Sequence, residues 1–454
     1  MNPPIDHEGF QRVPPHAIEA ETCVIGAMLY SVADCGEAMR ILDPEHFYRP
    51  AHQIIWQAML GMVENRIPVD LVTLKQHLVD RDQYTNIGGD DYTSAIMEGV
   101  PSSARATTYA KTVHEKWRLR ELIRLGSNVC NDAYATMADA GTLASGAAET
   151  LCGLLETDKA KRQVTAHEAG KMVLAEARAV KEGLKAPGLS TGFATVDGCI
   201  GGGFKPGQLV VVAADTSVGK SALLLKLLVN AVLISGVPAA LYSAEMSNLE
   251  LGQRLVQMQS GVNGLDIQMG RYNDADWFDM QKAVDDMSTW GERFRLTDSP
   301  MTVAQMRVDA MAMRMQLGEK LGLVGIDYLQ ILPAPDERNI RERIAGITRG
   351  TKLMAKDIEA PVLLLSQFSR AFKSEHREPE IRDLRESKTI EDDADVIILL
   401  HRPDPPVTLA GGGREIWVKI AKARGGRTTE WTGASSIRFC FFGPTTDYTE
   451  LRTN

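Results

Sequence analysis

Residues 208–231 read QLVVVAADTSVGKSALLLKLLVNA, an apolar run, a short loop and a second apolar segment. The loop from Ala214 to Ser221 matches the Walker A pattern, with alanine in place of the first glycine. The valine-rich run before it is typical of a buried strand, and the leucine-rich stretch after it is typical of a helix. Because the pattern requires this order of strand, loop and helix, we expect a phosphate-binding loop here.

The residue types in this loop suit a nucleoside triphosphate. Backbone N–H groups and the amino end of the following helix attract phosphates, and Gly219 allows close backbone approach. Lys220 can reach the β- and γ-phosphates, and the Ser221 hydroxyl can bind Mg²⁺. We therefore predict ATP and Mg²⁺ as cofactors, with Ala214, Ser217, Gly219, Lys220 and Ser221 in the binding loop.

Three polar residues at the ends of other apolar runs could complete an ATPase site. Asp327 ends LGLVGID and is a candidate for a second Mg²⁺-binding group. Glu245 ends AALYSAE and could act as the base that orients the attacking water. Gln367 ends APVLLLSQ, where its amide could sense the γ-phosphate. Taken alone, each residue is better explained as a turn or helix-cap residue, and only their combination with Lys220 favours catalysis.

From about residue 188 onward, short apolar runs alternate with longer periodic segments. The runs are QLVVVAA, AALYSAE, LGLVGID, APVLLLSQ, DVIILLH and EIWVKIA. This alternation predicts a mainly parallel sheet covered by helices, an α/β fold for residues 188–454. Ligands of such open sheets bind at the carboxyl ends of the strands. Lys220, Glu245, Asp327 and Gln367 all fall at or just after such ends.

The first part of the chain has a helical pattern instead. Apolar residues recur at helical spacing in HAIEAETCVIGAMLY and AHQIIWQAMLGM, and strand-like alternation is scarce. We predict an all-α N-terminal domain over residues 1–115 and a helical connector over 116–187. Within the connector, Thr165 and Glu168 form a capping-box signature that begins a helix near 165–183. The narrow apolar stripe of this helix must pack on its own chain or on a neighbouring subunit.

Two basic segments follow the candidate catalytic residues. The loop RAFKSEHREPEIRDLRESKTIEDDAD comes shortly after Gln367, so nucleotide state could move it. Its basic side chains could hold the phosphates of one DNA strand without regard to sequence, although a solvated loop explains its composition equally well. In EIWVKIAKARGG, Lys422 and Arg424 precede two glycines. They could reach the γ-phosphate of a neighbouring subunit as an arginine finger, or simply lie at an exposed hairpin tip.

Composition narrows the class of protein. The net charge of −9 disfavours a protein that coats duplex DNA, but it allows a local basic loop. The six cysteines form no CxxC pair, so neither a zinc site nor a disulfide framework is predicted. No stretch approaches the ~20 apolar residues that span a bilayer, and the amino terminus has no signal-peptide pattern. We therefore expect a cytoplasmic protein without a membrane partner.

Together these motifs resemble those of replicative DNA helicases of the DnaB family, along nearly the whole chain. Near the amino terminus the likeness lies in PPHAIEAETCVIGAML and HFYRPAHQIIWQAM, and around the loop in GLSTGFATVDGCIGGGFKPGQLVVVAADTSVGKS. SAEM, IDYLQ, SQFSR, DLRES, IEDDADVIILLHR and the KAR tip then follow in the order of the family. The resemblance implies a RecA-like P-loop ATPase domain that works in a hexamer.

The resemblance also implies roles for single residues in the ATPase site. Glu245 would be the catalytic base, and Asp327 would be the Walker B acid. Gln367 would couple nucleotide state to the DNA loop. Lys422 and Arg424 would act in trans on the ATP of the adjacent subunit.

Further features follow from the resemblance alone. Arg385, Glu386 and Lys388 would lie at the DNA, and Lys388 stands where the family commonly has glycine. The helix near 165–183 would dock on a neighbour. The hexamer would move 5′→3′ and recruit a primase and a helicase loader.

Three activities remain open at this point. The leading one is ATP-driven movement on single-stranded DNA with duplex unwinding at replication forks, which makes the chain an ATP-dependent DNA helicase. A RecA-type recombinase or another ring ATPase would share the core but not the helical N-terminal region. A non-catalytic hub, which binds ATP only to set its oligomeric state, would not need Glu245, Gln367 and Arg424 together.

Overall fold

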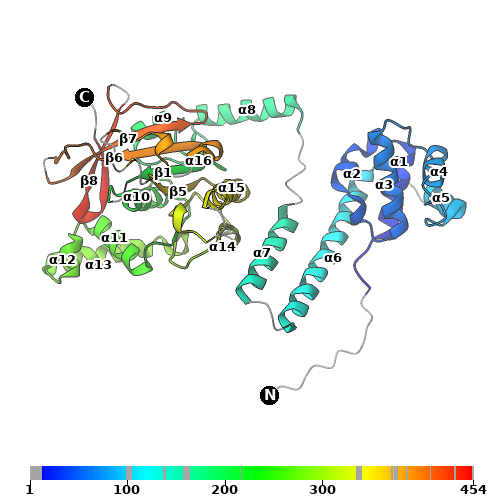
Figure 1. The fold of residues 1–454 in the computed structure, drawn as a ribbon, viewed down its shortest axis with the longest axis horizontal. Coiled ribbons are helices and arrows are strands. Elements are labelled where there is room, and N and C mark those ends of the chain that lie inside the picture. The colour runs from blue at the N-terminus through cyan, green and yellow to red at the C-terminus, as the bar shows by residue number, and fades with distance from the viewer. Residues whose placement is uncertain are drawn as a thin grey trace, which may run out of the picture. The chain divides into compact units, whose positions relative to one another are not determined.

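The computed structural model describes residues 13–98, 105–135, 140–156, 164–215, 217–333, 340–369, 372, 377–384, 387–409, 411–433 and 436–451. Contacts divide the chain into two units, Met1–Gln163 and Val164–Asn454. The first unit is helical, and the second contains the sheet (Figure 1). No described helix has the length and apolar character needed to cross a lipid bilayer.

The helices of the first unit bury the residues that their spacing predicts. They are α1 (Ile18–Tyr30), α2 (Gly36–Ile41), α3 (Pro50–Glu64), α4 (Leu71–Val79), α5 (Gly89–Glu98), α6 (Ala106–Tyr134) and α7 (Ala140–Glu156). Val24 and Met28 of α1 and Ile55 and Met59 of α3 are fully buried around Trp56. Apolar residues at this spacing share one helix face, so the predicted all-α N-terminal domain is confirmed.

The second unit is built on a nine-stranded sheet with the order β3-β2-β4-β5-β1-β6-β7-β8-β9. The strands are β1 (Leu209–Ala214), β2 (Ala239–Ser243), β3 (Phe294–Thr297), β4 (Leu323–Asp327), β5 (Val362–Gln367), β6 (Val396–His401), β7 (Arg414–Ala423), β8 (Ile437–Phe442) and β9 (Asp447–Leu451). β1 to β6 are parallel, and β7 to β9 extend the sheet in antiparallel fashion. The predicted α/β fold with a mainly parallel sheet is therefore confirmed.

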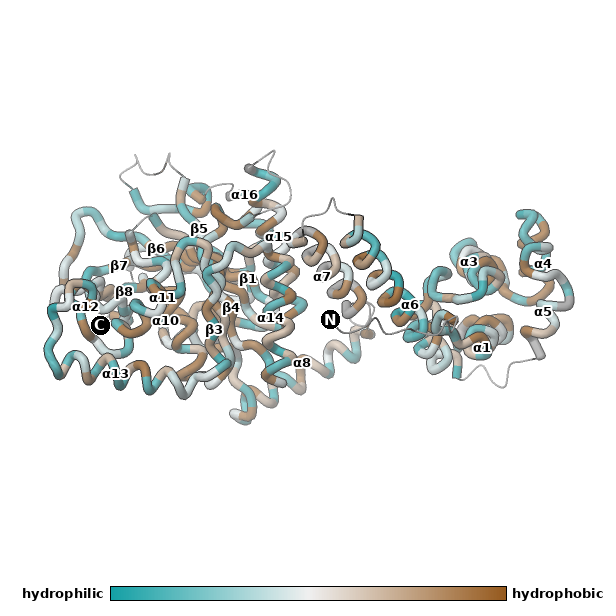
Figure 2. The backbone as a smooth tube through the Cα atoms, turned by 90° about the horizontal axis from the view of Figure 1, so that it is seen from below, coloured by the Kyte–Doolittle hydropathy of each residue, from teal (hydrophilic) through white to brown (hydrophobic). Residues whose placement is uncertain are grey.

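Helices cover both faces of the central strands. Val210 and Val212 of β1 belong to one core with α10 (Lys220–Leu233), whereas Leu209 and Val211 belong to a second core with α14 (Val303–Leu317) and α15 (Ile340–Ile358). Because successive side chains of a strand point to opposite faces, both faces of β1 must be apolar. Figure 2 shows the hydrophobic residues concentrated along α10 and the central strands.

The remaining helices are shorter or lie at the surface. They are α8 (Ala166–Lys181), α9 (Ala194–Cys199), α11 (Asn248–Ser260), α12 (Gly264–Gln268), α13 (Asp274–Ser288) and α16 (Ser387–Asp393). α8 begins with the predicted capping box, in which the Thr165 hydroxyl accepts from Glu168 N–H. Within the described chain α8 buries none of its residues, and Val173 in its apolar stripe is 66% exposed. This stripe is therefore not covered by the unit that carries it.

Candidate nucleotide-binding and catalytic site

The predicted phosphate-binding loop joins β1 to α10 and needs glycine at its last turn. Gly219 has φ +102°, a left-handed conformation that disfavours other residues. A Cβ atom there would lie 2.4 Å from the Tyr448 hydroxyl. That hydroxyl donates to the Val218 carbonyl at 2.9 Å, so it fixes the loop from the far end of the chain. Ser217 is also left-handed, with φ +62°.

Lys220 points its ammonium group back along the loop. Its side chain is buried, and Nζ donates to the carbonyls of Ala214 and Asp215 at 3.3 and 3.4 Å. Ala214, in the place of the first Walker A glycine, is fully buried at the end of β1. A lysine that spans the loop in this way presents its charge where phosphates would bind.

Asp327 lies buried at the carboxyl end of β4 with an unsatisfied oxygen. Burial raises the pKa of its carboxyl group to about 6, and the Glu245 carboxylate adds to this shift. A hydrogen bond from the Ser221 hydroxyl and the charge of Lys220 act in the opposite direction. Among the described residues, Asp327 Oδ1 has no hydrogen-bond partner. A buried carboxylate oxygen beside a hydroxyl suits Mg²⁺, which prefers oxygen ligands.

Glu245 and Gln367 lie at the same edge of the sheet. Glu245 follows β2, where Ser243 pairs with Asp327 and the N–H of Ala244 donates to the Asp327 carbonyl at 2.8 Å. The Glu245 side chain is exposed, so water can reach it. Gln367 ends β5 beside Ala214, and its amide hydrogen-bonds to the Tyr328 phenol.

The structure thus brings the four predicted groups together at the carboxyl edge of adjacent strands, in the order β2, β4, β5 and β1. Lys220, Glu245, Asp327 and Gln367 come from segments far apart in sequence. They meet because parallel strands end at a common edge. This arrangement can bind a triphosphate and orient a water molecule next to it.

A pocket of about 590 Å³ opens beside the loop. It is lined by Ser217 and Gly219, by Arg254 of α11, and by Phe441 and Pro444 near the end of the chain. The positive charge of Arg254 lowers the pKa of Asp327, which places this arginine near the site. The sequence analysis did not identify Arg254. Its place in α11, the helix that directly follows Glu245, could have indicated that it lies near the site.

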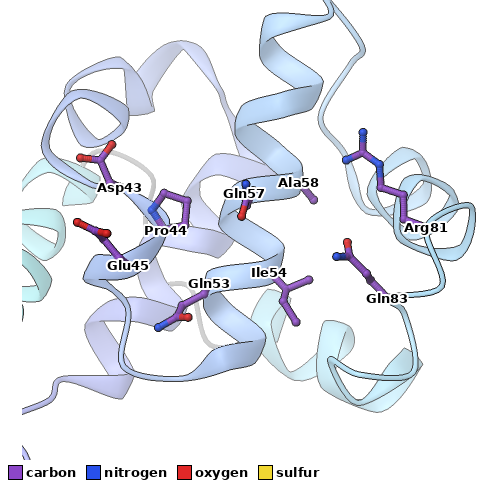
Figure 3. Close-up of a pocket in the computed structure, with 9 residues that line it drawn as sticks. All are labelled: Asp43, Pro44, Glu45, Gln53, Ile54, Gln57, Ala58, Arg81 and Gln83. Atoms are coloured by element: carbon purple, nitrogen blue, oxygen red, sulfur yellow. The ribbon is translucent and has the colours of Figure 1, made fainter.

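A second pocket, of about 750 Å³, lies in the first unit between η2 (Pro44–His46), α3 and the segment after α4 (Figure 3). Its charged lining consists of Asp43, Glu45 and Arg81, with glutamines between them. Two carboxylates against one cation make this pocket a poor site for a triphosphate. The pocket beside the Walker A loop is therefore the candidate nucleotide site.

Lys422 and Arg424 lie at the opposite edge of the sheet, the amino edge, where the parallel strands begin. Ala423 pairs with Val396, and Val396 pairs with Val210 at the start of β1. Arg424 is therefore about one strand length, roughly 20 Å, from the loop of its own chain. Its side chain is 64% exposed and forms an ion pair with Asp395 at 3.3 Å. Lys422 donates to the carbonyl of Glu391.

The candidate DNA residues are only partly described. Arg385 and Glu386 lie outside the described residues, whereas Lys388 is exposed on α16. The base of the loop closes where Phe368 pairs with Leu384, the residue before Arg385.

Two other arginines of this loop already have partners inside it. Arg377 binds both carboxylate oxygens of Asp383, and Arg382 binds Glu380. Arg377 is largely covered in this contact and stabilises the loop, whereas the side chain of Arg382 remains 69% exposed.

Comparison with known proteins identifies the family. The model described as DnaB-like helicase N terminal domain matches residues 13–115, and the model described as DnaB-like helicase C terminal domain matches residues 188–443. The Replicative DNA helicase DnaB of Geobacillus stearothermophilus is 33% identical over 425 residues, which cover 92% of each chain. The Replicative DNA helicase DnaC of Bacillus subtilis is 32% identical and covers 91% of each chain.

Solved structures agree with this fold. "The Structure Of A DnaB-Like Replicative Helicase And Its Interactions With Primase" aligns with a TM-score of 0.69 at 24% identity, over 96% of this chain and 100% of that chain. With both family models matched in order and a relative this similar over nearly its full length, the chain belongs to the DnaB-like helicase family.

Proposed function

We propose that this chain is the motor subunit of a replicative DNA helicase, which hydrolyses ATP, moves 5′→3′ along single-stranded DNA and unwinds the duplex at the fork. One observation carries the proposal. Lys220, Asp327, Glu245 and Gln367 meet at one edge of the sheet, while Arg424 is exposed at the other edge. An ATPase site that is completed between two subunits needs the phosphate-binding groups and the arginine at opposite edges of each subunit.

Within one subunit, each group at the carboxyl edge has a distinct task. The loop amides and Lys220 bind the phosphates, and Ser221 and Asp327 would hold Mg²⁺, which neutralises charge on the transferred phosphoryl group. Glu245 is exposed beside Asp327 and accepts a hydrogen bond from the attacking water, so that the water approaches the γ-phosphorus in line.

The second part of the site comes from another subunit. Arg424 lies too far from its own loop to contact the same nucleotide, but an exposed guanidinium can contact the ATP of a neighbour. If each subunit presents its amino edge to the carboxyl edge of the next, the contact is heterologous, and it forms a ring when the rotation between neighbours closes. We therefore propose a homo-hexamer in which Lys422 and Arg424 act in trans.

α8 provides a second contact between copies. Its apolar stripe is exposed, and a groove on the same unit is lined by Val256 of α11 and by Trp277, Phe278 and Val284 of α13. Three of these side chains, Trp277, Phe278 and Val284, are large apolar groups left about half or more exposed. An apolar helix and an apolar groove that remain uncovered on one chain fit each other on two copies. We propose that α8 fills this groove on its neighbour.

The DNA loop follows Gln367 in the chain. Gln367 is followed directly by Phe368, which pairs with Leu384 just before Arg385. A change at the γ-phosphate that shifts the Gln367 amide therefore shifts the base of the segment that contains Arg385, Glu386 and Lys388. We propose that these residues contact the DNA backbone in the ring. Because one solved relative is described with its interactions with primase, we add a primase as a partner. A helicase loader is proposed from the family resemblance alone.

The two rival activities have less support. A recombinase on the same core would not match the DnaB-like helicase N terminal domain model over residues 13–115. A non-catalytic hub would not need a water-accessible Glu245 beside a buried Asp327. Both features are present in this chain.

A forked-duplex assay tests the proposal. Purified full-length protein, ATP and Mg²⁺ are mixed with three substrates: a fork with both single-stranded tails, and forks that lack either the 5′ or the 3′ tail. We expect unwinding that requires the 5′ tail. Strand exchange without tail-dependent unwinding would favour a recombinase, and unwinding that requires only the 3′ tail would overturn the proposed direction.

A further inference from the structure

Asp395, the residue before β6, is a buried carboxylate held by several donors. Its side chain is only 5% exposed. Oδ2 accepts from the N–H of Leu209 at 2.8 Å and from the ammonium of Lys352 on α15. Lys352 also donates to the Gly207 carbonyl at 2.8 Å. Asp395 is therefore fixed to the first residue of β1 and to α15, and its orientation is set by the core of the sheet.

The other oxygen of Asp395 faces Arg424. The distance from Arg424 Nη1 to Asp395 Oδ1 is 3.3 Å, and the backbone N–H of Arg424 donates to the Asp395 carbonyl at 2.8 Å. Both the backbone and the guanidinium of Arg424 are thus placed by one residue. The rest of the Arg424 side chain remains 64% exposed, so a neighbouring molecule can reach it.

The charges allow Arg424 to leave this contact easily. Lys352, with a side chain only 16% exposed, already neutralises Asp395. When Arg424 moves away, no buried charge is left without a partner, which is the costly outcome when a buried ion pair is broken. An ion pair with one largely exposed member is also weak in water. The contact therefore orients the guanidinium without trapping it.

We propose that Asp395 is a positioning residue for Arg424. It holds the guanidinium at the subunit surface, ready to transfer to the γ-phosphate of the ATP bound by the neighbouring subunit. This inference rests on the proposed action of Arg424 in trans. Asp395 does not contact the nucleotide of its own chain, because it lies at the amino edge of the sheet and the Walker A loop lies at the carboxyl edge.

A double-mutant cycle tests whether Asp395 acts through Arg424. Asp395→Asn should lower kcat of the DNA-stimulated ATPase roughly 10- to 100-fold, the range for a displaced catalytic group, and leave KM for ATP unchanged. In an Arg424→Ala background the same change should have almost no further effect on kcat. Equal losses in both backgrounds would show that Asp395 acts independently of Arg424, and the inference would be wrong.

Two further variants separate positioning from folding. Asp392→Asn removes a similar charge from an exposed site on α16 and should leave kcat unchanged. Asp395→Glu keeps the charge beside Lys352 and moves it by one methylene, so it should lose less stability than Asp395→Asn and still lower kcat. This variant carries the test if Asp395→Asn does not assemble. Wild-type kcat in Asp395→Glu with a normal melting temperature would contradict the positioning role.

Mixed rings identify the subunit on which Asp395 acts. Subunits with Asp395→Asn are co-expressed with Lys220→Ala subunits under two affinity tags, and doubly tagged rings are purified. A site that joins the intact loop of the first subunit to the intact Arg424 of the second should regain ATPase activity. Rings of Arg424→Ala and Lys220→Ala subunits serve as the reference. Failure of this reference would refute the trans finger itself, whereas failure of only the Asp395→Asn mixture would refute the positioning role.

Discussion

Asp327 and Glu245 are two carboxylates of the same site with opposite environments. Asp327 is buried, and burial raises its pKa to about 6. Glu245 is exposed to solvent. A buried oxygen without a hydrogen-bond partner among the described residues is suited to a cation, and an exposed carboxylate is suited to water. The environments therefore favour Mg²⁺ at Asp327 and the attacking water at Glu245.

The role of Glu245 can be tested by removing its charge alone. Glu245→Gln should bind ATP with normal affinity, because the loop and Asp327 remain, but it should lose roughly 10²–10⁴-fold in kcat, as expected without a general base. Fluorescent-nucleotide binding and steady-state ATPase assays measure the two quantities. Glu115→Gln, an exposed acid in the first unit, is the matched control. A normal kcat in Glu245→Gln would exclude this residue from the mechanism.

At the residue scale, the sequence predicts groups that are marked by a local pattern. Lys220, Asp327 and Gln367 each follow or end an apolar run, and the sheet brings them together as expected. Tyr448 could not be found in this way, since it lies 230 residues from the Val218 carbonyl that it holds. The role of Asp395 could not be predicted from the sequence either, because it depends on contacts with Lys352 and Leu209, which are distant in sequence.

At the scale of elements, the strands that coincide with a strong apolar run were predictable, and three other strands were not. All six apolar runs are strands. Five of them lie in the parallel part of the sheet, where burial on both faces demands continuous apolar residues, and the sixth, β7, is antiparallel and alternates in burial. β3, β8 and β9 were missed. β3 is half-buried throughout, and β9 has one fully buried residue, so neither carries an apolar run. β3 and β9 are the outermost strands of the sheet, and their short, partly polar sequences are easily read as loop.

The proposed DNA-binding loop, residues 370–395, can be tested by reversing its charges. Changing both Arg385 and Lys388 to Glu should abolish stimulation of the ATPase by single-stranded DNA, because reversed charges repel the phosphates. The basal ATPase rate should persist, since neither residue belongs to the nucleotide site. The ratio of ATPase rates with and without a DNA oligonucleotide measures the effect.

A charge-matched control accompanies this variant. Changing Arg271 and Lys320 to Glu makes the same change in net charge at exposed positions away from the loop. This control should retain DNA stimulation. Unchanged stimulation in the loop variant would place the DNA-binding site elsewhere in the chain.

At the scale of the whole molecule, the proposed ATPase site is shared between two subunits, and each chain carries one part of it at each edge of its sheet. The Walker A loop, Asp327 and Glu245 lie at one edge of the sheet, and Arg424 lies at the other. α8 adds an uncovered apolar stripe, and α13 adds uncovered aromatic side chains. If copies join head to tail, Arg424 of one copy can reach the nucleotide of the next, and the apolar groups of α8 and α13 can cover each other. Activity should therefore depend on assembly as much as on the residues of one subunit.

This dependence can be tested at α8 without touching the ATPase site. Val173→Asp places a charge in the middle of the apolar stripe, so docking on a neighbour would bury an unpaired carboxylate. Since no residue of α8 is buried and Val173 is 66% exposed, the variant should fold with a normal melting temperature. Native mass spectrometry should show dissociated subunits, and ATPase activity should fall with them because Arg424 no longer reaches a neighbouring nucleotide. Ala175→Asp makes the same kind of change on the opposite face of the helix and should leave intact, active rings. Full-sized rings with the Val173→Asp change would show that α8 is not part of the contact between subunits.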